Sequence, residues 1–161
     1  MGNHHPTIAP YGAFTTQDGI IQIAVGNNTQ WHAMAGAVGL DPADPQFATA
    51  GDRVQHRTEL THALQARLHA RTSADWLASL AAVGVPSGKV RTLDEVYSWD
   101  QTLSQGLLVD VDHPTLGTIQ LPGPPLRLEN RDGTDTARQT HSAPPVLGQH
   151  DTEVGQWLDG R

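Results

Sequence analysis

The stretch FTTQDGIIQIAV, residues 14–25, decides the fold of this sequence. Its Asp18-Gly19 dipeptide is typical of hairpin turns, because aspartate and glycine both tolerate a positive φ. The apolar and β-branched run at residues 20–25 favours an extended, largely buried strand. The sequence therefore predicts a β-hairpin, and the elements that follow must pack against it.

Helical patterns begin directly after this hairpin. Gly26 breaks the strand, and Asn28 is a candidate N-cap for a helix that ends at Gly39. Three apolar residues of this helix share one face, namely Trp31, Ala35 and Val38. Their i, i+4, i+7 spacing predicts that this face packs on a core.

Three later helix starts share one device, a threonine N-cap with an acid three residues on. The hydroxyl satisfies a backbone N–H, and the carboxylate suits the positive end of the helix dipole. These pairs are Thr49 with Asp52, Thr72 with Asp75, and Thr92 with Glu95. Two of these helices have an apolar face, made by Leu60, Leu64 and Leu68 and by Trp76, Leu77, Leu80 and Ala81. Gly84 and Pro86 end the second of them.

The pattern changes after Gly106. A short helical turn at 100–105 precedes two strands, 107–111 and 118–121, that are joined by a turn. Prolines and the polar run 130–142 then predict loops, and a last helix is expected at residues 152–158.

The predicted fold class is α/β, with a small α+β domain in which a hairpin is followed by several helices. This domain is expected to span residues 1–105, and a β-rich, proline-rich return segment to span residues 106–161. The return segment has few apolar residues of its own, so we expect it to pack on another surface.

Composition limits the classes of partner. The chain has 161 residues and a net charge of −7, with 10 basic against 17 acidic residues. No basic stripe is present, so no nucleic acid and no anionic membrane surface is expected as a partner. Cysteine is absent, and no apolar run is long enough to span a bilayer or to serve as a secretory signal. A cytoplasmic location is therefore expected.

Side chains that could form a metal or catalytic site do not fall into a known pattern. His62 and His69 share a helix face, but about 10.5 Å separates them along the axis, too far for one zinc ion at roughly 2.0–2.1 Å from each nitrogen. Serines lack the G-x-S-x-G context, and Val85–Lys89 lacks the spacing of a phosphate loop and predicts a turn. Asp94-Glu95 and the pair Asp110 and Asp112 read as ordinary solvated carboxylates. We therefore predict no metal site, and no residue is assigned as catalytic.

A series of short motifs, each weak alone, resembles the C-terminal part of the family III CoA-transferases, the group that contains formyl-CoA transferase, carnitine CoA-transferase and 2-methylacyl-CoA racemase. They occur in the family's order at residues 2–11 (GNHHPTIAPY), 14–19, 47–53, 82–90, 113–117, 121–126 and 143–150.

This resemblance implies a function that the residues alone do not. It implies transfer of CoA between acyl-CoA thioesters and carboxylic acids through an aspartyl anhydride. The N-terminal half of the family's members supplies that aspartate and most of the CoA pocket, so the nucleophile is expected outside these 161 residues. Alternatives are an acyl-CoA racemase of the same family and a non-catalytic binding or scaffold subunit.

The resemblance also implies partners and a candidate site. CoA thioester is expected as a substrate, with no tightly bound cofactor, and the N-terminal half or a second copy of the chain is expected as partner, since family members are interlocked dimers. A glycine-rich loop that closes over the acyl-CoA in some members aligns with the start of this chain. Gly2, Asn3, His4 and His5 are therefore the candidate cofactor-binding residues. A plain connector and the remnant of a purification tag are the alternatives for this loop.

Overall fold

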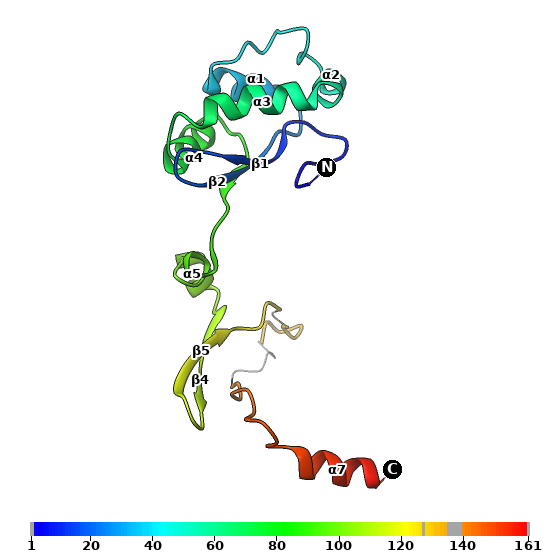
Figure 1. The fold of residues 1–161 in the computed structure, drawn as a ribbon, viewed down its shortest axis with the longest axis vertical. Coiled ribbons are helices and arrows are strands. Elements are labelled where there is room, and N and C mark those ends of the chain that lie inside the picture. Colours follow the sequence, from blue (N-terminus) through cyan, green and yellow to red (C-terminus); the bar gives the residue numbers. More distant parts are fainter. Residues whose placement is uncertain (1, 127, 135–139, 161) are drawn as a thin grey trace. The chain divides into compact units, whose positions relative to one another are not determined.

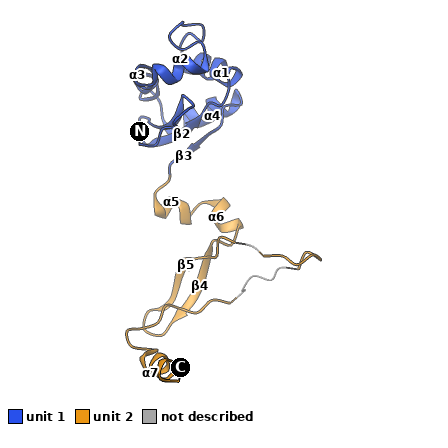
Figure 2. Cartoon of the chain, turned by 90° about the vertical axis from the view of Figure 1, so that its right-hand side faces the viewer, with its two compact units in different colours: residues 1–90 blue, residues 91–161 orange. Residues whose placement is uncertain are grey.

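The computed structural model describes residues 2–126, 128–134 and 140–160. The chain divides into two compact units, residues 1–90 and residues 91–161 (Figure 2). We call them the first and the second unit. The domain boundary predicted at residues 105/106 stays a prediction.

The predicted hairpin is present in the first unit. Strand β1 (Tyr11–Thr15) pairs antiparallel with β2 (Ile20–Ala24). Its turn differs from the predicted one, because Gly19 does not adopt a positive φ. Thr16 N instead donates to Gly19 O at 2.8 Å. Asp18 Oδ1 accepts from the backbone N of Ser73 at 2.7 Å, so a side chain ties the turn to a later helix.

A third strand corrects the prediction of a turn at Val85–Lys89. Strand β3 (Ser87–Lys89) pairs antiparallel with β2, which gives the sheet order β1-β2-β3. Flanking bonds extend the pairing, since Ala24 N donates to Pro86 O and Val90 N donates to Ile20 O. The strand is three residues long and carries no alternating apolar pattern, so its pairing partner and not its own sequence makes it a strand.

Helix α1 (Asn28–Val38) begins one residue before the predicted position. Asn27 is the N-cap, and its Oδ1 accepts from Gln30 N at 2.9 Å, so the prediction of Asn28 as the cap was wrong. Asn28 has another partner, because its Oδ1 accepts from Arg53 Nη2 at 2.8 Å. Gly39 ends the helix with φ 74°, as expected of a glycine C-cap.

Three more helices complete the first unit: α2 (Ala50–Gln55), α3 (Arg57–Leu68) and α4 (Ser73–Ala82). The predicted caps form, with Asp52 N donating to Thr49 Oγ1 at 3.1 Å and Asp75 N donating to Thr72 Oγ1 at 3.2 Å. His56, at φ −101° and ψ 34°, interrupts a run that the sequence treats as one helix and separates α2 from α3.

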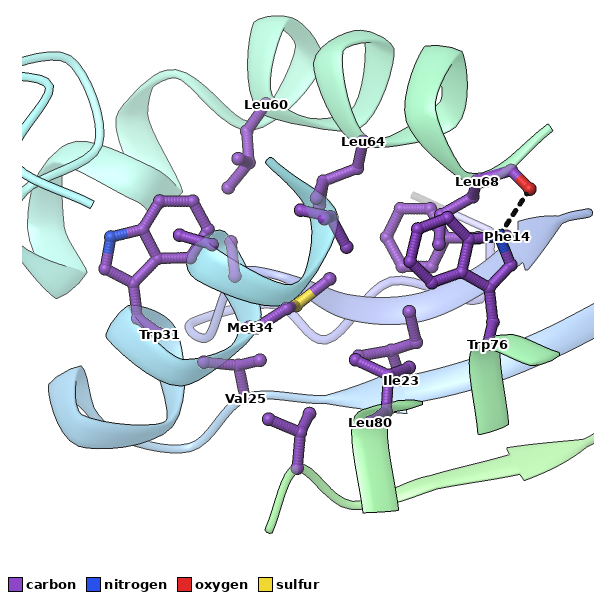
Figure 3. Close-up of a cluster of buried hydrophobic side chains, with 14 of the residues drawn as sticks. Phe14, Ile23, Val25, Trp31, Met34, Leu60, Leu64, Leu68, Trp76 and Leu80 are labelled. Atoms are coloured by element: carbon purple, nitrogen blue, oxygen red, sulfur yellow. Dashed lines mark hydrogen bonds between the residues drawn. The ribbon is translucent and has the colours of Figure 1, made fainter. Parts of the chain in front are cut away.

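The core of the first unit lies between the helices and the sheet (Figure 3). Leu60, Leu64 and Leu68 of α3 are buried as predicted. On α4 the predicted apolar face is narrower than expected, because Trp76 and Leu80 are buried while Ala81 is exposed. Trp76 Nε1 donates to Leu68 O at 2.8 Å, so the indole is buried with its polar atom satisfied.

The second unit contains two short helices, a hairpin and a last helix. Its elements are α5 (Leu93–Tyr97), α6 (Asp100–Ser104), β4 (Leu108–His113), β5 (Gly117–Pro122) and α7 (Asp151–Asp159). They agree with the predicted elements to within one or two residues. In α5, Thr92 N donates to Glu95 Oε2 at 3.1 Å, as its capping pattern predicts. The loop predicted at residues 130–142 lies partly outside the described residues.

The fold is a mixed α+β arrangement, as the sequence predicts (Figure 1). Among the described residues, the second unit has one buried hydrophobic side chain, Val111, whereas the first unit holds the whole core cluster. Within the part of the chain that the structure describes, no helix combines the length and the apolar character needed to cross a bilayer.

Candidate functional site

The candidate site begins at the N-terminal loop, which we define as residues 2–10. This loop precedes β1 and folds back on it, because His5 N donates to Tyr11 O at 3.0 Å. Pro10, which follows a cis peptide bond, accepts from Val25 N at 3.0 Å through its carbonyl. The loop is therefore joined to both strands of the hairpin.

A buried arginine holds the end of the loop. Arg53 of α2 is 1% exposed, and its Nε donates to Ala9 O at 3.0 Å. Its Nη1 donates to the carbonyls of Phe47 and Ala48, and its guanidinium carbon lies 5.2 Å from the Trp31 ring centroid. Burial lowers the pKa of Arg53 below its usual value, and the nearby Asp52 carboxylate opposes this effect. An arginine stays protonated in proteins, so Arg53 places a buried positive charge next to the end of the N-terminal loop.

A second arginine holds the middle of the loop. Arg57, the first residue of α3, donates from Nη2 to Pro6 O at 2.9 Å. Its Nε is buried and has no hydrogen-bond partner within the described part of the chain. One end of this guanidinium is thus used for positioning the loop, while another N–H of the same group lacks an acceptor.

The four predicted cofactor-binding residues have different surroundings. Gly2, at φ 56°, and Asn3 are exposed at the start of the loop. His5 stacks on Tyr11 with ring centroids 5.2 Å apart, and its Nδ1 accepts from Thr7 N. His4 lies edge-on to Phe14 at 6.1 Å. Their role in binding an acyl-CoA stays a prediction.

His4 also lines a pocket that we call the Arg57 pocket. It has a volume of about 330 Å³ and is lined by His4, Arg57, Thr58, Thr61 and His62. Four of these residues come from the first two turns of α3 and one comes from the N-terminal loop. The structure therefore places one predicted site residue, His4, beside four that the sequence reasoning did not select.

Sequence alone gave little reason to choose those four residues. Thr58 and His62 are four residues apart on a helix, as are Arg57 and Thr61, so both pairs mark a polar face. A polar helix face is usually solvated. The contact between Arg57 and Pro6, 51 residues apart in the sequence, and the shared pocket wall show that the loop lies beside this face.

None of the other histidines and carboxylates that the sequence raised is among the described residues that line this pocket. His69 is exposed at the end of α3, and in the described residues no group of three or more histidines, cysteines or acids could hold a metal ion. Asp110 and Asp112 of β4 accept from Gln120 and Thr118 of β5 across the second hairpin. These two carboxylates therefore support strand pairing.

Comparison with known proteins connects this geometry with an enzyme family. Residues 1–151 match the sequence profile of CoA-transferase family III. The chain is 36% identical over 155 residues to succinyl-CoA:glutarate CoA-transferase of Mus musculus, covering 95% of this chain and 34% of that protein. It is 29% identical over 134 residues to acetyl-CoA:oxalate CoA-transferase of Acetobacter aceti, covering 82% of this chain and 33% of that protein.

A solved structure shows the same fold. The chain superposes on a CAIB/BAIF family protein from Brucella suis with a TM-score of 0.76 and 32% identity, covering 99% of this chain and 40% of that one. The chain spans about a third of the length of the curated relatives that it matches. Because the family profile extends over residues 1–151, the chain belongs to CoA-transferase family III.

Proposed function

We propose that these residues form the C-terminal portion of an enzyme that transfers CoA from an acyl-CoA thioester to a carboxylic acid. The match to the family profile over residues 1–151 carries this proposal. The relatives named above are themselves CoA-transferases and are about three times as long as the matched region. Coenzyme A thioester is then a substrate, and no tightly bound cofactor is needed.

The proposed chemistry uses a carboxylate that lies outside this chain. An aspartate oxygen attacks the thioester carbonyl carbon, the C–S bond breaks, and CoA leaves as its thiolate while a mixed anhydride forms. A covalent intermediate of this kind divides one difficult step into two easier ones. The N-terminal portion of the transferase is the proposed partner that supplies this aspartate, and a second copy of this chain is the alternative partner for assembly.

The N-terminal loop is the proposed contribution of this chain to the site. Gly2, Asn3, His4 and His5 face the acyl-CoA in this proposal and keep water from the anhydride, which water would hydrolyse. Arg53 and Arg57 support the proposal because they hold the loop at Ala9 and Pro6. A loop with two such anchors can present backbone and side-chain groups in one arrangement.

We propose a dicarboxylic acid as the acceptor class. The names of the relatives mention succinate, glutarate, oxalate, mesaconate and citramalate. Each of these acids carries two carboxylates, so one remains charged after the other has formed the thioester. An acyl group of this kind needs a cationic or hydrogen-bonding partner for its free carboxylate.

A transfer assay tests the proposal. Succinyl-CoA and glutarate are incubated with the 161-residue chain alone, and again after adding the N-terminal portion of a family member, with glutaryl-CoA measured by mass spectrometry. We expect no product with the chain alone and product with the pair. Product formed by the chain alone, and abolished by changing one of its own aspartates, would contradict the proposed location of the nucleophile. Absence of product from a folded complex of both portions favours the non-catalytic alternative.

A further inference from the structure

We propose that the Arg57 pocket binds an oxyanion, the carboxylate or phosphate group of a ligand. That an oxyanion binds there is argued from the geometry of the first unit. That this oxyanion belongs to the substrate rests on the proposed function.

The unpaired N–H of Arg57 is the first argument. Its Nε is buried without a hydrogen-bond partner in the described residues, and a buried donor on a charged group is costly to leave unsatisfied. The guanidinium presents its N–H groups as a planar fork that suits carboxylate and phosphate oxygens. Because Nε itself is closed to solvent, an oxyanion in the pocket would meet the exposed part of the half-buried Arg57 side chain and stabilise its charge, while Nη2 keeps its bond to Pro6 O.

The other lining residues supply further donors. Thr58, Thr61 and His62 lie on one face of α3, at spacings of three and four residues. Threonine hydroxyls donate to any acceptor, and each imidazole ring carries at least one N–H. None of the described residues that line the pocket is acidic. The pocket therefore combines a cation with several neutral donors, which is the combination that an anion requires.

The position of His4 depends on a glycine. A Cβ at residue 12 would lie 2.5 Å from His4 Nδ1, closer than such atoms approach in real structures. Gly12 thus allows His4 to lie against β1, at the edge of the Phe14 ring and on the wall of the pocket. A side chain at residue 12 would displace His4, so the pocket is sensitive to a change outside its lining.

The size of the pocket agrees with a small ligand group. About 330 Å³ is about ten times the roughly 30 Å³ that one water occupies in the liquid. A carboxylate with a short carbon chain fits this space, and so does a phosphate. Since Arg57 contacts both the loop and the pocket, an oxyanion bound there would also stabilise the position of the loop.

Titration of the 161-residue chain tests the inference. The Arg57 Nε–H and the imidazole signals of His4 and His62 are followed by NMR while glutarate is added, with glutaramide as the uncharged control and sodium chloride as the ionic-strength control. Adenosine 3′,5′-bisphosphate forms a separate arm. Saturation with glutarate identifies a carboxylate site, and saturation only with the bisphosphate identifies a phosphate site. Equal shifts with sodium chloride, or no saturation with any anion, overturn the inference.

Two histidines of the same helix provide matched variants. His62 lines the pocket and His69 does not, and both are exposed, so neither change is expected to unfold α3. We expect His62→Ala to weaken anion binding by at least about threefold, the loss of one hydrogen bond of modest strength, and His69→Ala to leave it unchanged. Gly12→Ala should also weaken binding. Equal affinities of all three variants and the parent chain would overturn the inference.

The transfer assay separates this inference from the proposed function. A reconstituted transferase that works, built on a chain that binds no anion, overturns the inference and leaves the proposed function intact. A chain that binds glutarate through Arg57 but gives no product with its partner supports the inference and contradicts the proposed function.

Discussion

Arg53 and Arg57 are four residues apart, yet they have different tasks. Arg53 is fully buried, and each of its nitrogens donates to an acceptor, on Ala9, Phe47, Ala48 or Asn28. Arg57 is half-buried and lines a pocket, and its buried Nε has no acceptor among the residues that the structure describes. A guanidinium whose N–H groups all have acceptors supports the structure, whereas one with an N–H left without an acceptor is a candidate binding group. We therefore assign a structural role to Arg53 and a binding role to Arg57.

Replacing Arg53 by methionine is expected to destabilise the first unit by about 2–6 kcal/mol. The change removes the donors of the Ala9 and Phe47 carbonyls, which remain buried, and each unsatisfied group costs roughly 1–3 kcal/mol. Urea unfolding followed by tryptophan fluorescence measures the loss. Arg67→Met is the control, since Arg67 is exposed on α3. Equal losses for the two variants would show that the bonds of Arg53 contribute nothing to stability.

Asp18 makes the stability of the first unit dependent on pH. Its pKa lies below the usual 3.8, chiefly because the Ser73 backbone N–H donates to its carboxylate. A carboxyl group with a lowered folded-state pKa stabilises the protein above its unfolded-state pKa, and this contribution is lost as the pH falls through the folded-state value.

We therefore expect Asp18→Asn to reduce the change of the free energy of unfolding with pH. Between about pH 5 and pH 2 the free energy of unfolding should fall further in the parent chain than in the variant, because the amide does not titrate. Urea unfolding at a series of pH values gives both curves. Parallel curves over that range would contradict the lowered pKa of Asp18.

Single residues also show where sequence reasoning ends. A cap at the start of α1 was predictable because asparagine is a preferred N-cap, but Asn27 and Asn28 are equivalent in that respect. Asn28 is the partner of Arg53, which follows it by 25 residues, and no local pattern shows that contact. The Arg57 pocket escaped prediction for the same reason, since its wall joins residue 4 to residues 57–62.

Helix α3 has two faces with separate roles. One buries Leu60, Leu64 and Leu68 in the core, and the other presents Thr58 and His62 to the pocket. A helix that packs tightly on one face holds the residues of its other face in place, which is what a binding site requires. The stability of the core and the geometry of the candidate site are thus linked within one element.

Leu64→Ala should destabilise the first unit by about 2–5 kcal/mol, because the residue is completely buried and a cavity would remain. Thermal unfolding measures the loss. Val83→Ala is a suitable control in the same unit, since Val83 is 43% exposed after α4. A melting temperature of Leu64→Ala equal to that of the control would show that the buried face of α3 is not the leucine stripe.

The elements were predictable to the extent that their signals are local. Threonine caps, apolar stripes and the Asp18-Gly19 turn located four helices and the first hairpin. Strand β3 was missed because it is a short edge strand whose hydrogen bonds go to β2, about 65 residues earlier in the chain. The break between α2 and α3 was missed as well. It occurs at His56, and no glycine or proline marks the end of a helix there.

At the scale of the whole molecule, the two units differ in how many apolar side chains they bury. The first unit buries a contiguous cluster of apolar side chains, including two tryptophans. The described residues of the second unit bury Val111 and Thr102 and expose large apolar side chains. Leu126 is 73% exposed, Leu147 is not shielded at all at 105%, and Leu158 is 57% exposed. A contiguous patch of such side chains marks an interaction surface, and we expect these apolar side chains to meet another protein surface.

The part of the transferase that we propose as partner would cover these side chains. The matched relatives are about three times as long as this chain, so about two thirds of their residues have no counterpart here. Without that partner, the apolar side chains of the second unit must contact a second copy or stay in water. The hydrophobic effect favours the first outcome, at roughly 25 cal/mol for each Å² removed from water.

We therefore expect the isolated chain to self-associate through residues 106–150, or to leave them weakly protected from hydrogen exchange. Light scattering over a dilution series measures the association, and hydrogen exchange of the same samples compares residues 106–150 with α1, α3 and α4. Leu147→Glu should weaken association, because a charge cannot be buried there without a partner. Glu59→Gln, at an exposed position of α3 in the first unit, should leave association unchanged. A monomer in which residues 106–150 are as well protected as the helices of the first unit would contradict the prediction. It would mean that the few buried contacts around Val111 suffice to hold this unit together, and that the exposed leucines need no partner.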